Sequence, residues 1–174
     1  VLHSATKYLA GHNDVLAGVV VTDSADLYEK LFYNLNTTGA VLSPFDSYQL
    51  IRGLKTLSLR MERSTANAQE IVAFLEQSPA VKEVLYTGRG GMISFKVADE
   101  KRIPHILNTL KVFSFAESLG GVESLITYPT TQTHADIPAE VRHSYGLTDD
   151  LLRLSIGIED VRDLIEDLRQ ALEG

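Results

Sequence analysis

Three polar side chains near the start of the chain could act together on one small ligand. Ser4 and Thr6 carry hydroxyl groups, and Lys7 follows them with a primary amine. Hydroxyl groups donate hydrogen bonds to phosphate, and a lysine amine can form a Schiff base with an aldehyde. Pyridoxal phosphate has both groups on one ring, so it needs such donors close together. By itself the spacing favours a surface lysine in a polar turn, because this pattern is weak on physical grounds.

An arginine inside a strand-like segment could bind a carboxylate. In residues 151–156, alternation predicts a strand with aliphatic side chains on one face and Arg153 and Ser155 on the other. A guanidinium fixed on a strand can hold a carboxylate with two parallel hydrogen bonds. An exposed arginine at a sheet edge would give the same pattern, so both interpretations stay open.

The remaining polar motifs indicate little chemistry by themselves. The segment Ser118 to Gly121 is interpreted as a turn, which its two glycines favour. The histidines lack HxxxH or HExxH spacing, so no metal site is predicted. Glu159, Asp160 and the later acidic residues are interpreted as charges at a helix N-terminus and on a solvated face, not as an acid/base pair.

Composition argues against several classes of protein. The chain has 174 residues, with 16 Lys and Arg against 23 Asp and Glu, so its formal charge is −7. That charge argues against binding to nucleic acid or to an anionic membrane surface. No apolar run reaches the roughly 18 residues of a membrane span. Cysteine is absent, which excludes disulfides and thiolate chemistry. Because no export signal opens the chain, we expect a cytoplasmic protein.

Hydrophobic periodicity predicts a strand and helices in the first part of the chain. Residues 15–22 form an apolar, β-rich run, which predicts a buried strand. Asp23-Ser24 supplies the cap for a helix over 25–34, and Ser43-Pro44 begins another helical segment. From 45 to 77 apolar residues recur at helical spacing, which predicts one long bent helix or two joined helices.

The rest of the chain alternates strand-like and helix-like segments. Strands are predicted over 81–86, 91–97, 112–116, 124–128 and 151–156, and helices over 103–110, 138–145 and 160–172. Interleaved elements of this kind make an α/β layer. The chain has no initiating Met, and its first residues look like the end of a buried strand. We therefore expect it to begin inside a larger fold.

The segment around Lys7 resembles a known enzyme family. HSATKYLAGHNDV, at 3–15, is similar to the cofactor-lysine segment of the trans-sulfuration enzymes, which include cystathionine γ-synthases, cystathionine lyases and methionine γ-lyases. Further family-like blocks follow in the expected order: TGAVLSP at 38–44, RGLKTL at 52–57, AESLGGVES at 116–124, TH at 133–134 and LRLSIGIED at 152–160. One departure is the short turn at Arg89, where many relatives carry a longer loop.

The resemblance implies an α/β protein of fold type I. Residues 1–52 would be the C-terminal part of the large, aspartate-aminotransferase-like domain that binds pyridoxal 5'-phosphate. Residues 53–174 would be a small C-terminal α/β domain with a mainly antiparallel sheet. The N-terminal half of the family fold is missing from this sequence and would be its partner. That half supplies the phosphate loop, the aromatic stacked on the ring and the aspartate at the ring nitrogen. The family is usually a homotetramer built as a dimer of dimers.

The resemblance also implies roles for individual residues. Lys7 would hold the cofactor covalently, and Ser4 and Thr6 would bind its phosphate. Arg153 matches the arginine that holds the α-carboxylate of the amino-acid substrate, and Ser118 matches a residue that helps to bind it. Glu117 distinguishes family members, since several synthases and γ-lyases have Glu at this position; its carboxylate could engage the amino group of cystathionine or of cysteine.

The activity implied by the resemblance is γ-replacement. An O-acylhomoserine would lose its acyl group from Cγ, and the sulfur of cysteine would add to give cystathionine. Lyase action on cystathionine, at the γ or β position, is the alternative. A third possibility is a catalytically silent fragment that serves as a structural or assembly partner. We expect this chain alone to be inactive, because the missing half supplies most of the cofactor's partners.

Overall fold

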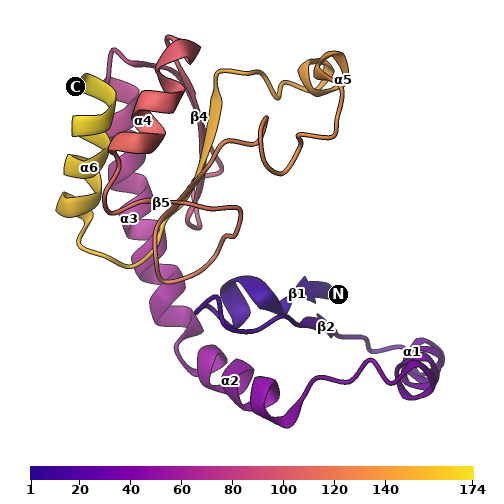
Figure 1. Ribbon diagram of the computed structural model, residues 1–174. Helices are drawn as coiled ribbons and strands as arrows, with labels where there is room; N and C mark the ends of the chain where they lie inside the picture. Colours follow the sequence, from indigo (N-terminus) through magenta and orange to yellow (C-terminus); the bar gives the residue numbers. More distant parts are fainter. The chain divides into compact units, whose positions relative to one another are not determined.

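Two units, residues 1–57 and 58–174, make up the computed structural model, which describes every residue of the chain (Figure 1). The expected boundary at residue 52 lies inside helix α2 (Pro44–Lys55), whereas the observed division comes after the end of that helix, between residues 57 and 58. Helix α2 stays with the first unit because Gly53 packs closely on the chain around Ala10. A Cβ at Gly53 would lie 2.2 Å from the Ala10 carbonyl oxygen.

The first unit opens with a two-stranded antiparallel sheet. Strand β1 (Leu2–Ser4) pairs with β2 (Gly18–Val20). The buried strand predicted over 15–22 is wrong in length and in burial, since β2 has 3 residues and its outer two are exposed. The expected burial of the opening strand is also wrong, because β1 is exposed throughout. The physical reason is that a sheet of two strands has no neighbours to cover its edges and faces.

Local sequence sets the ends of the two helices that follow. Helix α1 (Ala25–Thr38) begins after Ser24, whose side chain accepts a backbone amide hydrogen bond. It runs past the predicted end at Asn34, because the next stop signal is Gly39, which ends it in the left-handed conformation at φ 69°. Helix α2 begins at Pro44, as predicted, and Ser43 caps it through its side chain.

The first unit has only a small core. Its buried apolar residues are Ala5, Ala10, Val15 and Leu50. No residue of α1 is buried, and the stacked rings of Tyr28 and Phe32 are 59% and 55% exposed. A largely apolar groove of about 640 Å³ runs between α1 and β2. The unit therefore leaves much of its apolar surface uncovered.

The second unit is built on a five-stranded mixed sheet in the order β3-β4-β7-β6-β5. The strands are β3 (Val81–Tyr86), β4 (Met92–Val97), β5 (Ser114–Phe115), β6 (Leu125–Thr127) and β7 (Leu151–Ser155). Three neighbouring pairs are antiparallel, and only β5 and β6 run parallel. All five predicted strands are present, each trimmed or unchanged at its ends.

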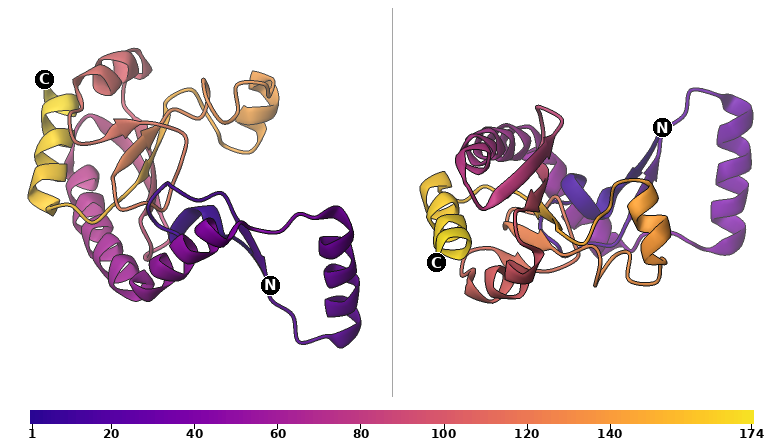
Figure 2. Two further views of the ribbon diagram at one scale, coloured as in Figure 1. Left: turned by 60° about the horizontal axis from the view of Figure 1, so that its bottom comes forward. Right: turned by 90° about the horizontal axis from the view of Figure 1, so that it is seen from above.

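Three helices cover one face of this sheet (Figures 1 and 2). Helices α3 (Leu57–Gln77), α4 (Ile103–Thr109) and α6 (Val161–Glu173) contribute buried aliphatic residues to one core with β4, β6 and β7. Of the two alternatives for 45–77, the structure has two helices, which separate at Thr56. The short elements η2 (Glu100–Arg102) and α5 (Ala139–Ser144) lie before α4 and before β7. None of the helices is long and apolar enough to span a membrane.

Acidic residues near the C-terminus take two different roles. Asp160 caps α6 by accepting from the Arg162 amide, which agrees with its interpretation as a helix N-terminal charge. The solvated-face interpretation is wrong for Asp167, which is buried. Its carboxylate accepts hydrogen bonds of 2.8–3.1 Å from the successive backbone amides of residues 111–113. The reason is local: the chain before β5 turns three donors towards α6, and a carboxylate satisfies them.

Candidate active site

Lys7 lies in a wide, π-helical turn of the first unit. The π-helical turn η1 (Ala5–Leu9) follows β1 directly, and Lys7 departs from helical geometry within it, at φ −91° and ψ −126°. The Thr6 amide donates to the Ala17 carbonyl oxygen at 3.1 Å, and the Gly11 amide donates to the Lys7 carbonyl oxygen at 2.8 Å. These bonds fix the backbone on both sides of the lysine.

The three predicted cofactor-binding side chains fit a ligand that carries a phosphate and an aldehyde. Ser4 is exposed at the end of β1, and Lys7 is half-buried. The Thr6 hydroxyl accepts a hydrogen bond from the Ala17 amide at 2.9 Å and donates one to the Ala17 carbonyl oxygen at 3.2 Å. If the amide keeps its bond, the hydroxyl proton can turn to a phosphate oxygen. Two hydroxyl donors and one amine therefore lie within one short segment.

A polar cavity of about 350 Å³ lies beside the chain that follows Lys7 in the first unit. Its lining includes His12, Asp14, Gln49 and Arg52. The Gln49 amide group donates to the Asp14 carboxylate at 3.1 Å, which joins α2 to the loop after the turn. Because this loop and the turn are continuous, the placement of Lys7 depends on α2.

In the second unit, Arg153 stands in a row of polar residues across three strands. It pairs with Ser94 on β4 and with Thr127 on β6, so the three share the sheet face opposite the helices. The neighbouring residues Leu152 and Leu154 are fully buried in the core on the other face. The predicted alternation of β7 is thus confirmed, and Arg153 is at the centre of the sheet rather than at its edge.

The Arg153 guanidinium is anchored at one nitrogen and has unused donors. Its Nη2 donates to the Thr127 hydroxyl at 3.2 Å and to the Glu117 carbonyl oxygen at 3.3 Å. Its Nε is buried and has no hydrogen-bond partner. Burial lowers the pKa of Arg153, and the nearby Glu117 carboxylate acts in the opposite direction. An arginine side chain stays protonated in proteins, so this is a fixed positive charge with donors to spare.

The loop before β6 brings the other two predicted substrate residues to this arginine. Glu117 is joined to Arg153 through its backbone, and its own side chain is exposed. Ser118 follows and is half-buried. The Gly120 amide donates to the Ser155 hydroxyl at 2.8 Å, so the polar side chains of β7 hold the loop at two points. Glu117 thus contacts Arg153 through its carbonyl oxygen, with Ser118 next to it in the chain, while Ser4, Thr6 and Lys7 lie in the first unit.

Sequence reasoning missed a buried polar network that supports this loop. The Ser124 hydroxyl donates to the Glu159 carboxylate at 2.9 Å and accepts from the Gly157 amide at 2.9 Å. The Asn67 side chain donates to the carbonyl oxygens of Gly157 and Glu159, at 3.2 and 2.9 Å. Glu159 is half-buried beside the start of α6, and its carboxylate also accepts a hydrogen bond from the Ser124 hydroxyl, a contact that the sequence did not predict. A polar Asn within the apolar stripe of α3 was the available signal.

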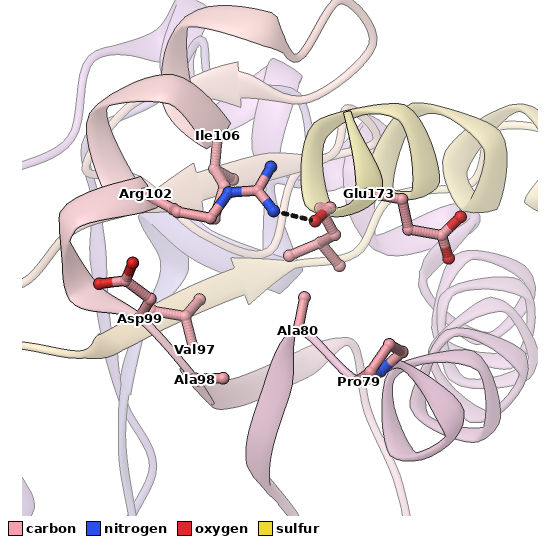
Figure 3. A pocket seen from close by; sticks show the side chains of 9 residues that line it. Pro79, Ala80, Val97, Ala98, Asp99, Arg102, Ile106 and Glu173 are labelled. Atoms are coloured by element: carbon pink, nitrogen blue, oxygen red, sulfur yellow. Dashed lines mark hydrogen bonds between the residues drawn. The ribbon is translucent and has the colours of Figure 1, made fainter.

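A cavity of about 410 Å³ in the second unit contains none of the predicted site residues (Figure 3). Its lining is mainly aliphatic and includes Asp99 and Arg102. The Arg102 guanidinium points to the end of α6 and donates to the Leu172 carbonyl oxygen at 2.9 Å. This arginine satisfies a helix C-terminus, which is a structural role.

Comparison with known proteins places the chain in a family. A model of the Cys/Met metabolism PLP-dependent enzymes matches residues 1–173. The chain is 58% identical, over 99% of its length and 46% of the relative's, to a cystathionine γ-synthase/O-acetylhomoserine (thiol)-lyase of Bacillus subtilis. It is 52% identical to a cystathionine γ-lyase of the same organism, over 99% of the chain and 50% of that protein. A crystal structure of Xanthomonas oryzae cystathionine γ-synthase in complex with cystathionine superposes with a TM-score of 0.94 at 42% identity, over 99% of this chain and 49% of that one.

The chain therefore belongs to the Cys/Met metabolism family of enzymes that depend on pyridoxal phosphate. The resemblance seen in the sequence is confirmed for the family and its cofactor, and with them the α/β fold of type I. The relatives include synthases and lyases, so the family match is common to both activities. The chain spans about half the length of the curated relatives that it matches.

Proposed function

We propose that the enzyme to which this chain contributes performs γ-replacement, forming cystathionine from an O-acylhomoserine and cysteine. The observation that carries the proposal is the Arg153 guanidinium, which is fixed at Nη2 and keeps a buried, unpartnered Nε. An unpartnered buried donor costs about 1–3 kcal/mol, and a carboxylate ligand is the group that would satisfy it. The α-carboxylate of an amino acid fits this requirement. Among the similar proteins, two with identities of 58% and 55% carry a synthase name, which supports replacement over elimination.

Lys7, Ser4 and Thr6 would hold the cofactor, which supplies an electron sink for the substrate when it is bound. The hydroxyls of Ser4 and Thr6 would donate to its phosphate. The Lys7 amine, once displaced by the amino group of the substrate, would act as the base that removes the proton from Cα and then moves protons to and from Cβ. Ser118 would help Arg153 to orient the carboxylate, and the exposed Glu117 carboxylate would face the amino group of the incoming cysteine.

We further propose that the chain forms the C-terminal half of such an enzyme, with the N-terminal half as its partner and a homotetramer, in the cytoplasm, as the assembly. Two observations support the partner. The first unit buries only four apolar residues in its core, and α1 buries none of its residues. The relatives have about twice the length of this chain, so they contain a comparable mass of protein that could cover these faces. Intact mass of the source protein tests the arrangement: a mass near 19.2 kDa would contradict it.

The reaction is tested with a full-length enzyme that contains this chain. One assay supplies O-acylhomoserine and cysteine, and a second supplies cystathionine alone. Synthesis faster than cleavage is expected, whereas rapid cleavage without synthesis would favour a γ- or β-lyase, as several relatives are named. Glu117→Val should impair synthesis while leaving cofactor absorbance unchanged. Lys7→Ala should abolish turnover, and retention of full turnover would refute the role of Lys7.

The silent-fragment alternative is tested with the 174-residue chain by itself. We expect no measurable cystathionine formation after addition of pyridoxal phosphate, because the small core of the first unit gives Lys7 little support. Loss of one preorganised electrostatic partner costs about 3 kcal/mol in the barrier, and the missing half would supply several. Turnover comparable to that of a full-length relative would contradict the need for a partner.

A further inference from the structure

The Thr127 side chain links Arg153, the predicted carboxylate-binding residue, to Ala116. Nothing in the sequence around Thr127 marks it as functional. It ends β6 and is 1% exposed. Its hydroxyl donates to the Ala116 carbonyl oxygen at 2.7 Å and lies 3.2 Å from Arg153 Nη2, which donates to it. A hydroxyl has one proton and two lone pairs. Because the proton goes to Ala116, a lone pair is left to face the guanidinium.

The contacts around Thr127 fix the arginine from two directions. Arg153 Nη2 also donates to the Glu117 carbonyl oxygen, and Ala116, which Thr127 holds, precedes Glu117 in the chain. Thr127 therefore positions both acceptors of Nη2, one directly and the other through the backbone. The β-branched side chain restricts χ1, so the hydroxyl has a set direction. At the far end of the loop, the Ser155 hydroxyl accepts from the Gly120 amide.

This anchoring matters because a free arginine side chain has many rotamers. Both long basic side chains lose considerable entropy when they are held, and a guanidinium that is already held loses less on binding. The two bonds occupy Nη2, while Nε is buried without a partner. The guanidinium plane is thus set before any ligand arrives.

We propose that Thr127 is a positioning residue that presets the Arg153 guanidinium for the α-carboxylate of the substrate. The inference rests on the proposed function of Arg153. It assigns to Thr127 a contribution to carboxylate affinity through Arg153, without contact between Thr127 and the reacting atoms. The competing interpretation is that the Thr127 hydroxyl serves only to satisfy the Ala116 carbonyl.

The test compares Thr127→Val, which keeps the side-chain shape and removes the hydroxyl, with Thr127→Ser, which keeps the hydroxyl. In the full-length enzyme, Thr127→Val should raise the KM of the amino-acid substrate about tenfold, the effect of one lost hydrogen bond to a charged group, and change kcat by less than about threefold. Thr127→Ser should restore KM to within about threefold of wild type. Binding of a substrate-like amine that lacks the carboxylate should be the same in all three proteins.

The outcomes separate this inference from the proposed function. Arg153→Lys serves as the reference, and it should abolish the preference for the carboxylate-bearing ligand. If Arg153→Lys leaves that preference intact, the proposed function is wrong. If Arg153→Lys removes it but Thr127→Val does not raise KM, only the positioning role is wrong. An equal loss of affinity for both ligands in Thr127→Val would show a purely structural role and would also overturn the inference.

A measurement on the unmodified 174-residue chain covers the case in which Thr127→Val does not fold. Nitrogen-detected NMR reports rotation about the Cζ–Nη bonds of arginine. Because Nη2 of Arg153 is held by two acceptors, its rotation should be slower than that of the exposed Arg89. Equal rotation rates for the two arginines would overturn the inference without any substitution.

Discussion

The two units of the chain differ in the size of their hydrophobic cores and therefore in the stability that each can have by itself. The second unit packs three helices on a five-stranded sheet and buries seventeen hydrophobic residues in one core. The first unit has a two-stranded sheet and four such residues, three of which come from residues 5–15. Core size governs stability, because each buried aliphatic side chain contributes about 1.5–3 kcal/mol. The second unit should therefore hold its fold alone, and the first should not.

This difference separates the two kinds of chemistry. Arg153 is on a central strand of the well-packed unit, where sheet pairing on both sides fixes it. Lys7 is in a kinked turn of the sparsely packed unit, held by backbone bonds to a single loop. The proposed carboxylate site around Arg153 should be preformed in this chain, whereas the proposed cofactor site around Lys7 should depend on whatever covers the first unit.

The largest expected effect on stability appears when a buried leucine of the second unit is compared with an exposed leucine of the first. Leu152 is fully buried on β7, and Leu16 is 85% exposed in the first unit. Leu152→Ala should lower the free energy of unfolding by about 2–5 kcal/mol, through lost burial and a cavity. Leu16→Ala, its matched control, should change it by less than about 0.5 kcal/mol. Urea denaturation of the 174-residue chain, followed by far-UV circular dichroism, measures both, and equal losses would remove the distinction between the units.

The next effect concerns the buried carboxylate of the second unit. Asp167→Ala leaves the backbone amides of residues 111–113 without their acceptor, and Gln170 loses a partner as well. We expect the free energy of unfolding to fall by about 2–4 kcal/mol. Each unsatisfied buried donor costs about 1–3 kcal/mol, and water will reach some of these amides. Asp163→Ala, an exposed change in the same helix, should cost less than about 0.5 kcal/mol. The same urea titration measures both variants, and similar values for the two would show that the Asp167 cap adds nothing.

The sequence predicted elements better than it predicted burial and partners. The helix starts at Ser24 and Ser43 follow from local chemistry and were predicted, whereas the end of α1 at Gly39 was predicted too early, at Asn34. The burial of β1 and β2 could not be predicted, because it depends on neighbours that the chain does not supply. In the same way, Lys7 and Arg153 have recognisable contexts, but the hydrogen bond from Arg153 to Thr127 depends on the register of β6 against β7. Register is a tertiary property and has no signal in either strand alone.

A smaller effect tests how the first unit holds Lys7. Gly-to-Ala changes inside helices usually stabilise by about 1 kcal/mol. At Gly53 the new Cβ would lie 2.2 Å from the Ala10 carbonyl oxygen and 2.8 Å from that of Leu9, and backbone atoms cannot move aside cheaply. Gly53→Ala should therefore destabilise the first unit by about 1–3 kcal/mol.

Hydrogen exchange in the full-length enzyme, measured at the Gly11 amide that bonds to the Lys7 carbonyl, reports this local change. Its rate should rise about tenfold in Gly53→Ala for each 1.4 kcal/mol lost, while amides of β7 stay unchanged. Lys55→Ala, an exposed change in the same helix, should leave the Gly11 rate unaltered. Faster exchange in β7 as well would mean that the two units unfold together and do not differ in stability.

The smallest expected effect is a dependence on pH that belongs to the second unit alone. Asp150 precedes β7, and burial by itself would raise the pKa of its carboxyl group. Hydrogen bonds from Thr148 and Lys82 outweigh burial and hold that pKa below its usual value of 3.8. A carboxyl group whose pKa is lower in the folded state than in the unfolded state stabilises the fold above the unfolded pKa. This contribution is lost as the pH falls through the folded pKa.

Because Lys82 is largely exposed, we expect Asp150 to contribute less than about 1 kcal/mol to the free energy of unfolding. Asp150→Asn should therefore be less stable than wild type at neutral pH, and the gap should close as the pH falls below 3.8 and through the lowered folded pKa. Urea midpoints across this range measure the gap, with Asp136→Asn, an exposed loop change, as the control. A gap that persists in acid would mean that the side-chain shape at residue 150 matters and its charge does not.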